Sequence, residues 1–142
     1  MKKAIKLIAL SLVLVMAVLA LASCAAPNAD PAKAKETLEK NGYSVQKLDG
    51  KISTTAISTI VGEDVDCVIT AEKIDKEAES LEILCVLYFE DAEDANDAWE
   101  KAKEYADSIK EKSEDAAESD WVVDKSGKMI WFGTKNAVKA AA

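Results

Sequence analysis

The first 24 residues of the chain differ sharply from the rest and decide how much of it folds as a domain. A basic head with three lysines comes first, and an apolar run of sixteen residues from Leu7 to Ala22 follows it, interrupted only by Ser11. As a helix this run spans about 24 Å, which is short of the ~30 Å hydrocarbon core of a bilayer. A basic head, a short apolar run and a small-residue junction are the parts of a secretory signal peptide. The sequence therefore predicts that residues 1–23 are removed and that the remaining 119 fold outside the cytoplasm.

The junction itself has the pattern of a lipid-attachment site. The residues Leu21-Ala22-Ser23-Cys24 resemble the lipobox of bacterial lipoprotein precursors, in which the cysteine is lipidated and becomes the new N-terminus. The resemblance implies a thioether-linked diacylglycerol on Cys24, and two acyl chains suffice for stable anchoring where one is marginal. The alternative is an uncleaved membrane anchor, or an ordinary signal peptide with a chance cysteine. We expect a lipidated tether at 24–29, a single domain at 30–142, and a location on the extracytoplasmic face of the cell membrane.

The composition of the expected mature chain argues against several functions. Its fifteen cations are all lysine, it carries 26 carboxylates, and its net charge is −11. Nucleic-acid binding needs clustered basic residues to neutralise phosphates, so no nucleic-acid partner is expected. The chain lacks histidine, the usual general base and the commonest zinc ligand, and its five glycines are isolated. We therefore predict a protein that is not an enzyme, with no catalytic residues, metal site or cofactor.

The residue patterns predict an α+β domain. Helices are expected at 31–40 and 92–112, with a short one after Thr134, and strands at 43–48, 64–73, 80–89, 121–125 and 128–132. The segment 52–61 has an apolar stripe that favours a short helix, and its β-branched residues leave an extended segment as the alternative. Together these elements predict an antiparallel sheet of about five strands with helices packed mainly on one face. The chain also contains the joins FEDAEDA (89–95) and WFGTKNA (131–137), which resemble segments of small, uncharacterised lipoproteins of Gram-positive bacteria. That resemblance implies a similar fold and no particular activity.

The two central strands suggest a specific register. Centring their connection on Lys76 gathers apolar residues of both strands on one face and sets Cys67 directly opposite Cys85. Opposed residues of antiparallel strands have Cα atoms about 4.5 or 5.5 Å apart, a separation that permits a disulfide outside the cytoplasm. A pair of small buried thiols is the alternative.

The other faces of these strands are also apolar and predict a surface for binding or dimerisation. This predicted face consists of Val68, Leu84, Val86, Tyr88, Val122, Met129 and Trp131. An apolar face of this kind needs a cover, which the helix at 52–61, a second copy of the chain, or a ligand would provide.

These patterns favour a non-catalytic binding or interaction module of unknown ligand, held at the membrane by the lipid on Cys24. The alternative is a structural or accessory subunit of an envelope protein complex, in which the same face contacts a permanent partner. In a homodimer, a second copy of the chain would cover that face.

Overall fold

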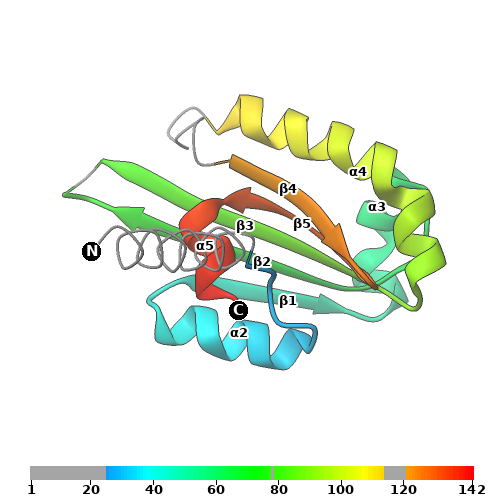
Figure 1. The fold of residues 1–142 in the computed structure, drawn as a ribbon, viewed down its shortest axis with the longest axis horizontal. Coiled ribbons are helices and arrows are strands. Elements are labelled where there is room, and N and C mark those ends of the chain that lie inside the picture. Colours follow the sequence, from blue (N-terminus) through cyan, green and yellow to red (C-terminus); the bar gives the residue numbers. More distant parts are fainter. Residues whose placement is uncertain (1–24, 78, 114–120) are drawn as a thin grey trace, which may run out of the picture.

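The computed structural model describes residues 25–77, 79–113 and 121–142, which form helices on both sides of one sheet (Figure 1). The sheet has five antiparallel strands in the order β1-β2-β3-β5-β4. The strands are β1 (Ser44–Asp49), β2 (Val65–Asp75), β3 (Ser80–Phe89), β4 (Trp121–Ser126) and β5 (Met129–Thr134). The helices are α2 (Pro31–Lys40), α3 (Lys51–Val61), α4 (Ala92–Lys112) and α5 (Lys135–Ala140). The predicted α+β class and five-stranded antiparallel sheet are confirmed. Within the described ranges, no helix is long and apolar enough to cross a membrane.

The helices cover both faces of the sheet, and the prediction that they pack mainly on one face is wrong. On the face we call the closed face, Leu38 of α2 and Val138 of α5 join a core with Ile69 and Trp131. On the opposite face, which we call the pocket face, α3 and α4 pack over a second core that includes Val68, Leu87 and Ile130. The sequence pattern shows which residues of a helix are apolar, but it does not show to which side of the sheet the chain carries that helix.

The register between β2 and β3 differs from the predicted one by three residues. Cys67 pairs with Tyr88, and Cys85 pairs with Thr70. Strand β2 continues to Asp75, and the pairing shifts between Val65 and Cys67, so the connection is centred beyond Lys76. Because side chains alternate between the faces of a sheet, an odd shift exchanges the faces of one strand relative to the other.

This shift separates the two cysteines. Cys67 belongs to the core of the closed face, whereas Cys85 packs against the core of the pocket face. The predicted opposition of the two cysteines is therefore wrong. Both thiols are free, so the disulfide derived from that opposition is wrong as well.

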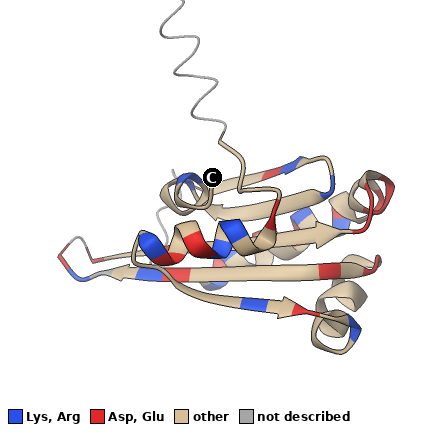
Figure 2. Ribbon diagram, turned by 90° about the horizontal axis from the view of Figure 1, so that it is seen from below, with Lys and Arg blue, Asp and Glu red and all other residues tan. Residues whose placement is uncertain are grey.

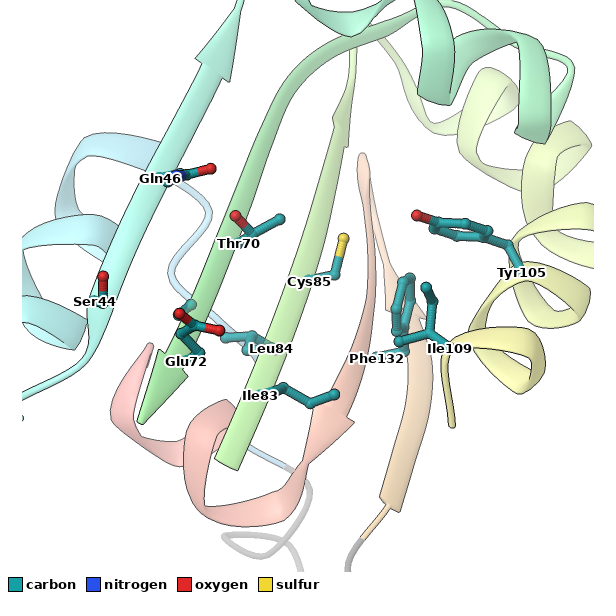
Figure 3. A pocket seen from close by; sticks show the side chains of 11 residues that line it. Ser44, Gln46, Thr70, Glu72, Ile83, Leu84, Cys85, Tyr105, Ile109 and Phe132 are labelled. Carbon is teal, nitrogen blue, oxygen red and sulfur yellow. The ribbon is translucent and has the colours of Figure 1, made fainter. Parts of the chain in front are cut away.

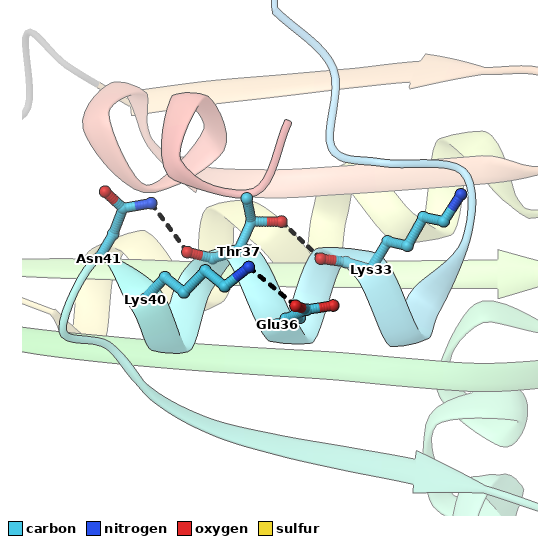
Figure 4. A network of polar contacts seen from close by, with 5 residues as sticks. All are labelled: Lys33, Glu36, Thr37, Lys40 and Asn41. Atoms are coloured by element: carbon cyan, nitrogen blue, oxygen red, sulfur yellow. Dashed lines mark hydrogen bonds and ion pairs between the residues drawn. The ribbon is translucent and has the colours of Figure 1, made fainter.

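Helix α2 is bounded by side chains at both of its ends, and Figure 4 shows the one at its C-terminal end, Asn41. At its start, the Asp30 carboxylate accepts a backbone N–H of the first turn at 3.0 Å. At its end, the side-chain amide of Asn41 donates to the carbonyl oxygen of Thr37 at 2.8 Å. On the exposed side, Lys40 Nζ lies 2.8 Å from Glu36 Oε1 and lowers the pKa of that carboxyl by hydrogen bonding and by its charge. Such local capping interactions explain why the predicted bounds of this helix are confirmed.

Helix α4 and the hairpin that follows it were also largely predictable. The carboxylate of Asp91 accepts the N–H of Asp94 at 2.9 Å and caps α4, whose bounds match the prediction. The hairpin turns at Gly127 and Lys128, one residue later than predicted, because Ser126 pairs with Met129. The resulting shift in pairing is even, so the side chains of the two strands keep the relative faces that the predicted turn implies.

Strands β3 and β5 approach each other unusually closely at Gly133. A Cβ atom at this position would lie 2.2 Å from the carbonyl oxygen of Ile83, so only glycine fits. The neighbouring Thr134 hydroxyl donates to the same carbonyl at 3.3 Å and accepts the Ile83 N–H at 3.2 Å. Thr134 precedes α5 as predicted, but its side chain makes no capping bond to that helix.

The segment before α2, residues 26–28, is bound to the closed face, and we call it the N-terminal strap. Pro27 is buried, and Ala26 packs against the core of the closed face. The Asn28 N–H donates to the carbonyl oxygen of Ala141 at 2.8 Å, and the Tyr88 hydroxyl donates to the carbonyl oxygen of Asn28 at 2.8 Å. The expected tether at 24–29 is therefore attached to the domain from residue 26 onward.

Candidate ligand-binding pocket

The predicted binding or dimer face is covered within the chain itself. Six of its seven residues are buried, with exposed fractions of at most 7%, and the seventh, Val122, is partly buried. Helices α2 and α5 and the N-terminal strap cover it, rather than the helix at 52–61. Val68 does not belong to this face, since the register places it on the pocket face. The prediction that Leu84, Val86, Tyr88, Val122, Met129 and Trp131 form a binding or dimer face is therefore wrong, because these residues belong to or pack against the core beneath α2 and α5.

The pocket face has an opening that sequence reasoning missed. Its side chains form rows across the strands, and α3 and α4 cover the row of Val68, Leu87 and Ile130. Two further rows lie beyond the reach of α3 and hold Gln46, Thr70, Cys85 and Phe132, then Ser44, Glu72 and Ile83. A cavity of about 360 Å³ lies over these rows, with Tyr105 and Ile109 of α4 as its wall (Figure 3).

The two sides of this pocket differ in chemical character (Figure 3). The side formed by β1 and β2 is polar, with Ser44, Gln46, Thr70 and Glu72. The side formed by β3, β5 and α4 carries the apolar or aromatic side chains of Ile83, Cys85, Phe132, Ile109 and Tyr105. Among the lining residues there is one carboxylate and no cation. Apolar walls with a few convergent polar groups are typical of small-molecule sites.

Aromatic contacts fix the apolar wall. The ring of Phe132 is 2% exposed and packs edge-to-face with Tyr105, at 5.7 Å between ring centroids and 86° between planes. The ring of Trp121 also lies near Phe132, with 6.2 Å between the two ring centroids. These contacts attach the C-terminal half of α4 to β4 and β5, so the wall is held by packed rings rather than by a loop. Burial raises the pKa of the Tyr105 phenol, which keeps its hydroxyl neutral.

The thiol of Cys85 forms part of the pocket floor. Burial raises its pKa from 9.0 to about 12, so the thiol stays protonated near neutral pH. Among the described residues, the lining holds no histidine or lysine, and Glu72 is its one carboxylate. Because a nucleophilic cysteine needs a thiolate, Cys85 serves here as a small apolar surface. The residues that line the pocket are suited to binding.

A second groove lies beside α3 and is lined by more acidic than basic residues, with Lys51 as the one cation among the described residues of its lining. In Figure 2 acidic residues, coloured red, gather at the end of the sheet where α4 begins. The groove is formed by threonines and serine of α3 and by five carboxylates, which are Glu63, Asp64, Asp66, Glu90 and Asp94. The pKa of Asp94 is raised by partial burial and by the neighbouring carboxylates. In the part of the chain that the structure describes, no three His, Cys, Asp or Glu residues lie close enough to hold a metal ion.

No protein-family model, curated protein or solved structure matches this chain at a significant level. The site therefore has to be interpreted from the residues of this chain alone. Of the pocket side chains described above, the sequence patterns singled out Cys85 alone, and as the partner of Cys67 rather than as part of a binding site. The signal it passed over is the alternation of polar residues in the first two strands, at Ser44, Gln46, Thr70 and Glu72, opposite apolar residues of β3.

Proposed function

We propose that this protein is a membrane-anchored extracytoplasmic lipoprotein whose domain binds a small ligand without transforming it. The observation that carries the proposal is the 360 Å³ pocket, which is polar on one side and apolar on the other. Elsewhere the helices of the domain pack over the two apolar cores of the sheet. A cavity of this size accommodates a small ligand, at the lower end of the range for small-molecule sites.

The N-terminal strap supports the anchoring half of the proposal. Only Ala25 separates Cys24 from Ala26, which packs on the closed face. Two residues of extended chain span about 7 Å. A lipid on Cys24 would therefore hold the closed face near the membrane and leave the pocket, on the opposite face of the sheet, accessible to solutes.

The part of the chain that the structure describes offers no exposed face of the kind on which the alternative of an accessory subunit with a permanent partner was based. That alternative depended on the apolar face that the structure buries beneath α2, α5 and the strap. Among the described residues, the exposed large apolar side chains are Leu48, Ile52, Ile60 and Ile74. A homodimer through the predicted face would need that cover to be displaced.

The anchoring half is tested by expressing the full chain and its Cys24→Ser variant in a bacterial host. We expect the wild-type protein in the membrane fraction, with a diacylglyceryl group on Cys24 in the mass spectrum of its first peptide. The Cys24→Ser variant should keep residues 1–23 and carry no lipid. An unmodified Cys24 in the wild-type protein would refute the anchor.

The binding half is tested with residues 25–142, which include every element of the described domain. A fragment library is screened by two-dimensional NMR for ligands that shift the amides of Thr70, Cys85 and Tyr105. Thr70→Phe fills the pocket from its floor and should therefore abolish such binding. The fold should survive the change, because aromatic residues are well tolerated in strands. Ser126→Phe adds the same ring at an exposed position outside the pocket and should leave binding intact. Hits that bind equally well to both variants would refute the pocket as the site.

A further inference from the structure

The charge of the pocket points to a particular class of ligand. We propose that it selects a compact amphiphile with an ammonium head and an apolar body that contains a ring, and that Glu72 is the counter-ion of the head. This inference rests on the proposed function, since it names the chemistry of the same site.

Glu72 sets the sign of the charge that the pocket accepts. Its carboxylate is the one charged group among the lining residues. The adjacent Lys73 does not neutralise the pocket, because the alternation of β2 places it toward the other face. There its Nζ lies 3.2 Å from the Asn41 carbonyl oxygen and 5.5 Å from the centre of the Tyr43 ring. An anionic ligand would meet uncompensated repulsion at Glu72, whereas a cation gains a partner.

The neighbours of Glu72 suit an ammonium group in particular. Ser44 is its cross-strand partner on β1, and Gln46 and Thr70 are partners in the next row. An ammonium carries three N–H donors and no acceptor. The carboxylate of Glu72 with the hydroxyl and amide oxygens beside it offers acceptors for all three. These side chains come from two adjacent strands and line the same side of the pocket in Figure 3.

The apolar side of the pocket sets the body of the ligand. Ile83 on β3 is the cross-strand partner of Glu72 on β2, and Cys85 on β3 is the partner of Phe132 on β5. Adjacent strands are about 4.8 Å apart, so the span from β2 to β5 is roughly 10 Å. We therefore consider a ligand that lies across the strands and has a short chain between its charged head and its ring. Such a ligand places the head at Glu72 and the ring against Phe132 and Ile109. Aromatic rings pack favourably against such a wall.

The test uses three probes with the same ring and similar length: 2-phenylethylammonium, 2-phenylethanol and 3-phenylpropanoate. Each is titrated into residues 25–142 of the protein, and its dissociation constant is read from the amide shifts of Thr70, Cys85 and Tyr105. We expect the ammonium probe to bind about fivefold more tightly than the alcohol, a ratio typical of a partly exposed ion pair. The anionic probe should bind most weakly.

Two carboxylate variants assign the preference to Glu72. Glu72→Gln removes the charge and keeps the shape, so the ammonium and alcohol probes should then bind equally. Glu36→Gln makes the same charge change on α2, on the opposite face, and should preserve the fivefold ratio. Glu72 is exposed, so its replacement should leave the fold intact.

The outcomes separate this inference from the proposed function. Equal binding of all three probes to the pocket, or tighter binding of the anion, would overturn the ammonium preference and leave the pocket as a ligand site. The absence of ammonium binding would overturn the inference, while the fragment screen with Thr70→Phe decides the function by itself. A preference that persists in Glu72→Gln would overturn the assignment of the counter-ion.

Discussion

The two faces of the sheet are built from the same strands but are closed to different degrees. On the closed face, two helices and the N-terminal strap cover residues such as Ile69, Val86 and Trp131. On the pocket face, α3 and α4 cover one end of the strands and leave the rows of Thr70 and Glu72 open. The difference indicates that the closed face is covered along the strands, whereas the pocket face combines a buried core at one end with space that a ligand can fill.

The largest expected effect compares two adjacent residues of β2 that point to opposite faces. Ile69 is fully buried on the closed face, whereas Thr70 is partly buried in the pocket. Ile69→Ala should lower the free energy of unfolding by about 2–5 kcal/mol, because it removes buried methyl groups and leaves a cavity. Thr70→Ala should cost less than about 1 kcal/mol. Urea denaturation of both variants measures the difference, and equal losses would contradict the distinction between the faces.

The next effect concerns the pH dependence of the pocket face. Burial raises the pKa of Cys85 from 9.0 to about 12. Above pH 9 the thiol ionises in the unfolded chain but stays protonated in the folded one, so ionisation favours unfolding. The stabilising contribution is complete below pH 9 and is lost as the pH rises toward 12, by about 1.4 kcal/mol per pH unit.

The comparison with Cys85→Ala isolates this contribution. Burial also raises the pKa values of Tyr43, Tyr88 and Tyr105, and these groups are present in both proteins. Their contributions cancel in the difference except for the smaller effect of the Cys85 charge on Tyr105. Thermal unfolding midpoints measured between pH 8 and 11 should fall less steeply for the variant than for the wild-type protein. Parallel slopes would show that solvent in the pocket reaches the thiol.

A smaller effect is expected where the N-terminal strap meets the closed face. Tyr88→Phe removes the hydrogen bond from the Tyr88 hydroxyl to the Asn28 carbonyl and should cost about 1 kcal/mol. The change should be local, since the ring itself stays buried. Hydrogen exchange is expected to accelerate at the Asn28 amide, which bonds to Ala141, and to stay unchanged at Ile69. Unchanged exchange at Asn28 would mean that the hydrogen bond to Ala141 and the packing of Ala26 and Pro27 hold the strap without the Tyr88 hydroxyl.

Sequence patterns predicted those elements that local interactions determine. Helix α4 has its alanine stripe and the cap at Asp91 within its own residues, and its bounds were predicted correctly. The connection between β2 and β3 has no glycine, asparagine or proline to set its turn, and Glu79 adopts a positive φ of 51° that its residue type does not indicate. The register was therefore mispredicted, and with it the face of each side chain on β3 relative to those on β2.

The pocket depends on relations that a linear sequence does not contain. It exists because α3 ends short of the rows of Thr70 and Glu72, and because α4 lies over β4 and β5 instead of β1. The strands supply its lining only in their actual register, which places Gln46 beside Thr70 and Cys85 beside Phe132. The polar residues of β1 and β2 were visible in the sequence, but their common cavity was not.

The smallest effect is expected on the outer surface of α2, which lies on the closed face but faces solvent. Glu36 and Lys40 form an ion pair with most of both side chains exposed. The pair lowers the pKa of Glu36, so any stabilisation is present at neutral pH and is lost as the pH falls through that carboxyl's folded pKa. Because solvent and salt screen such pairs, Glu36→Gln should leave the urea midpoint unchanged at physiological ionic strength. A measurable loss that disappears in high salt would show that surface charge, as well as buried packing, contributes to the stability of the closed face.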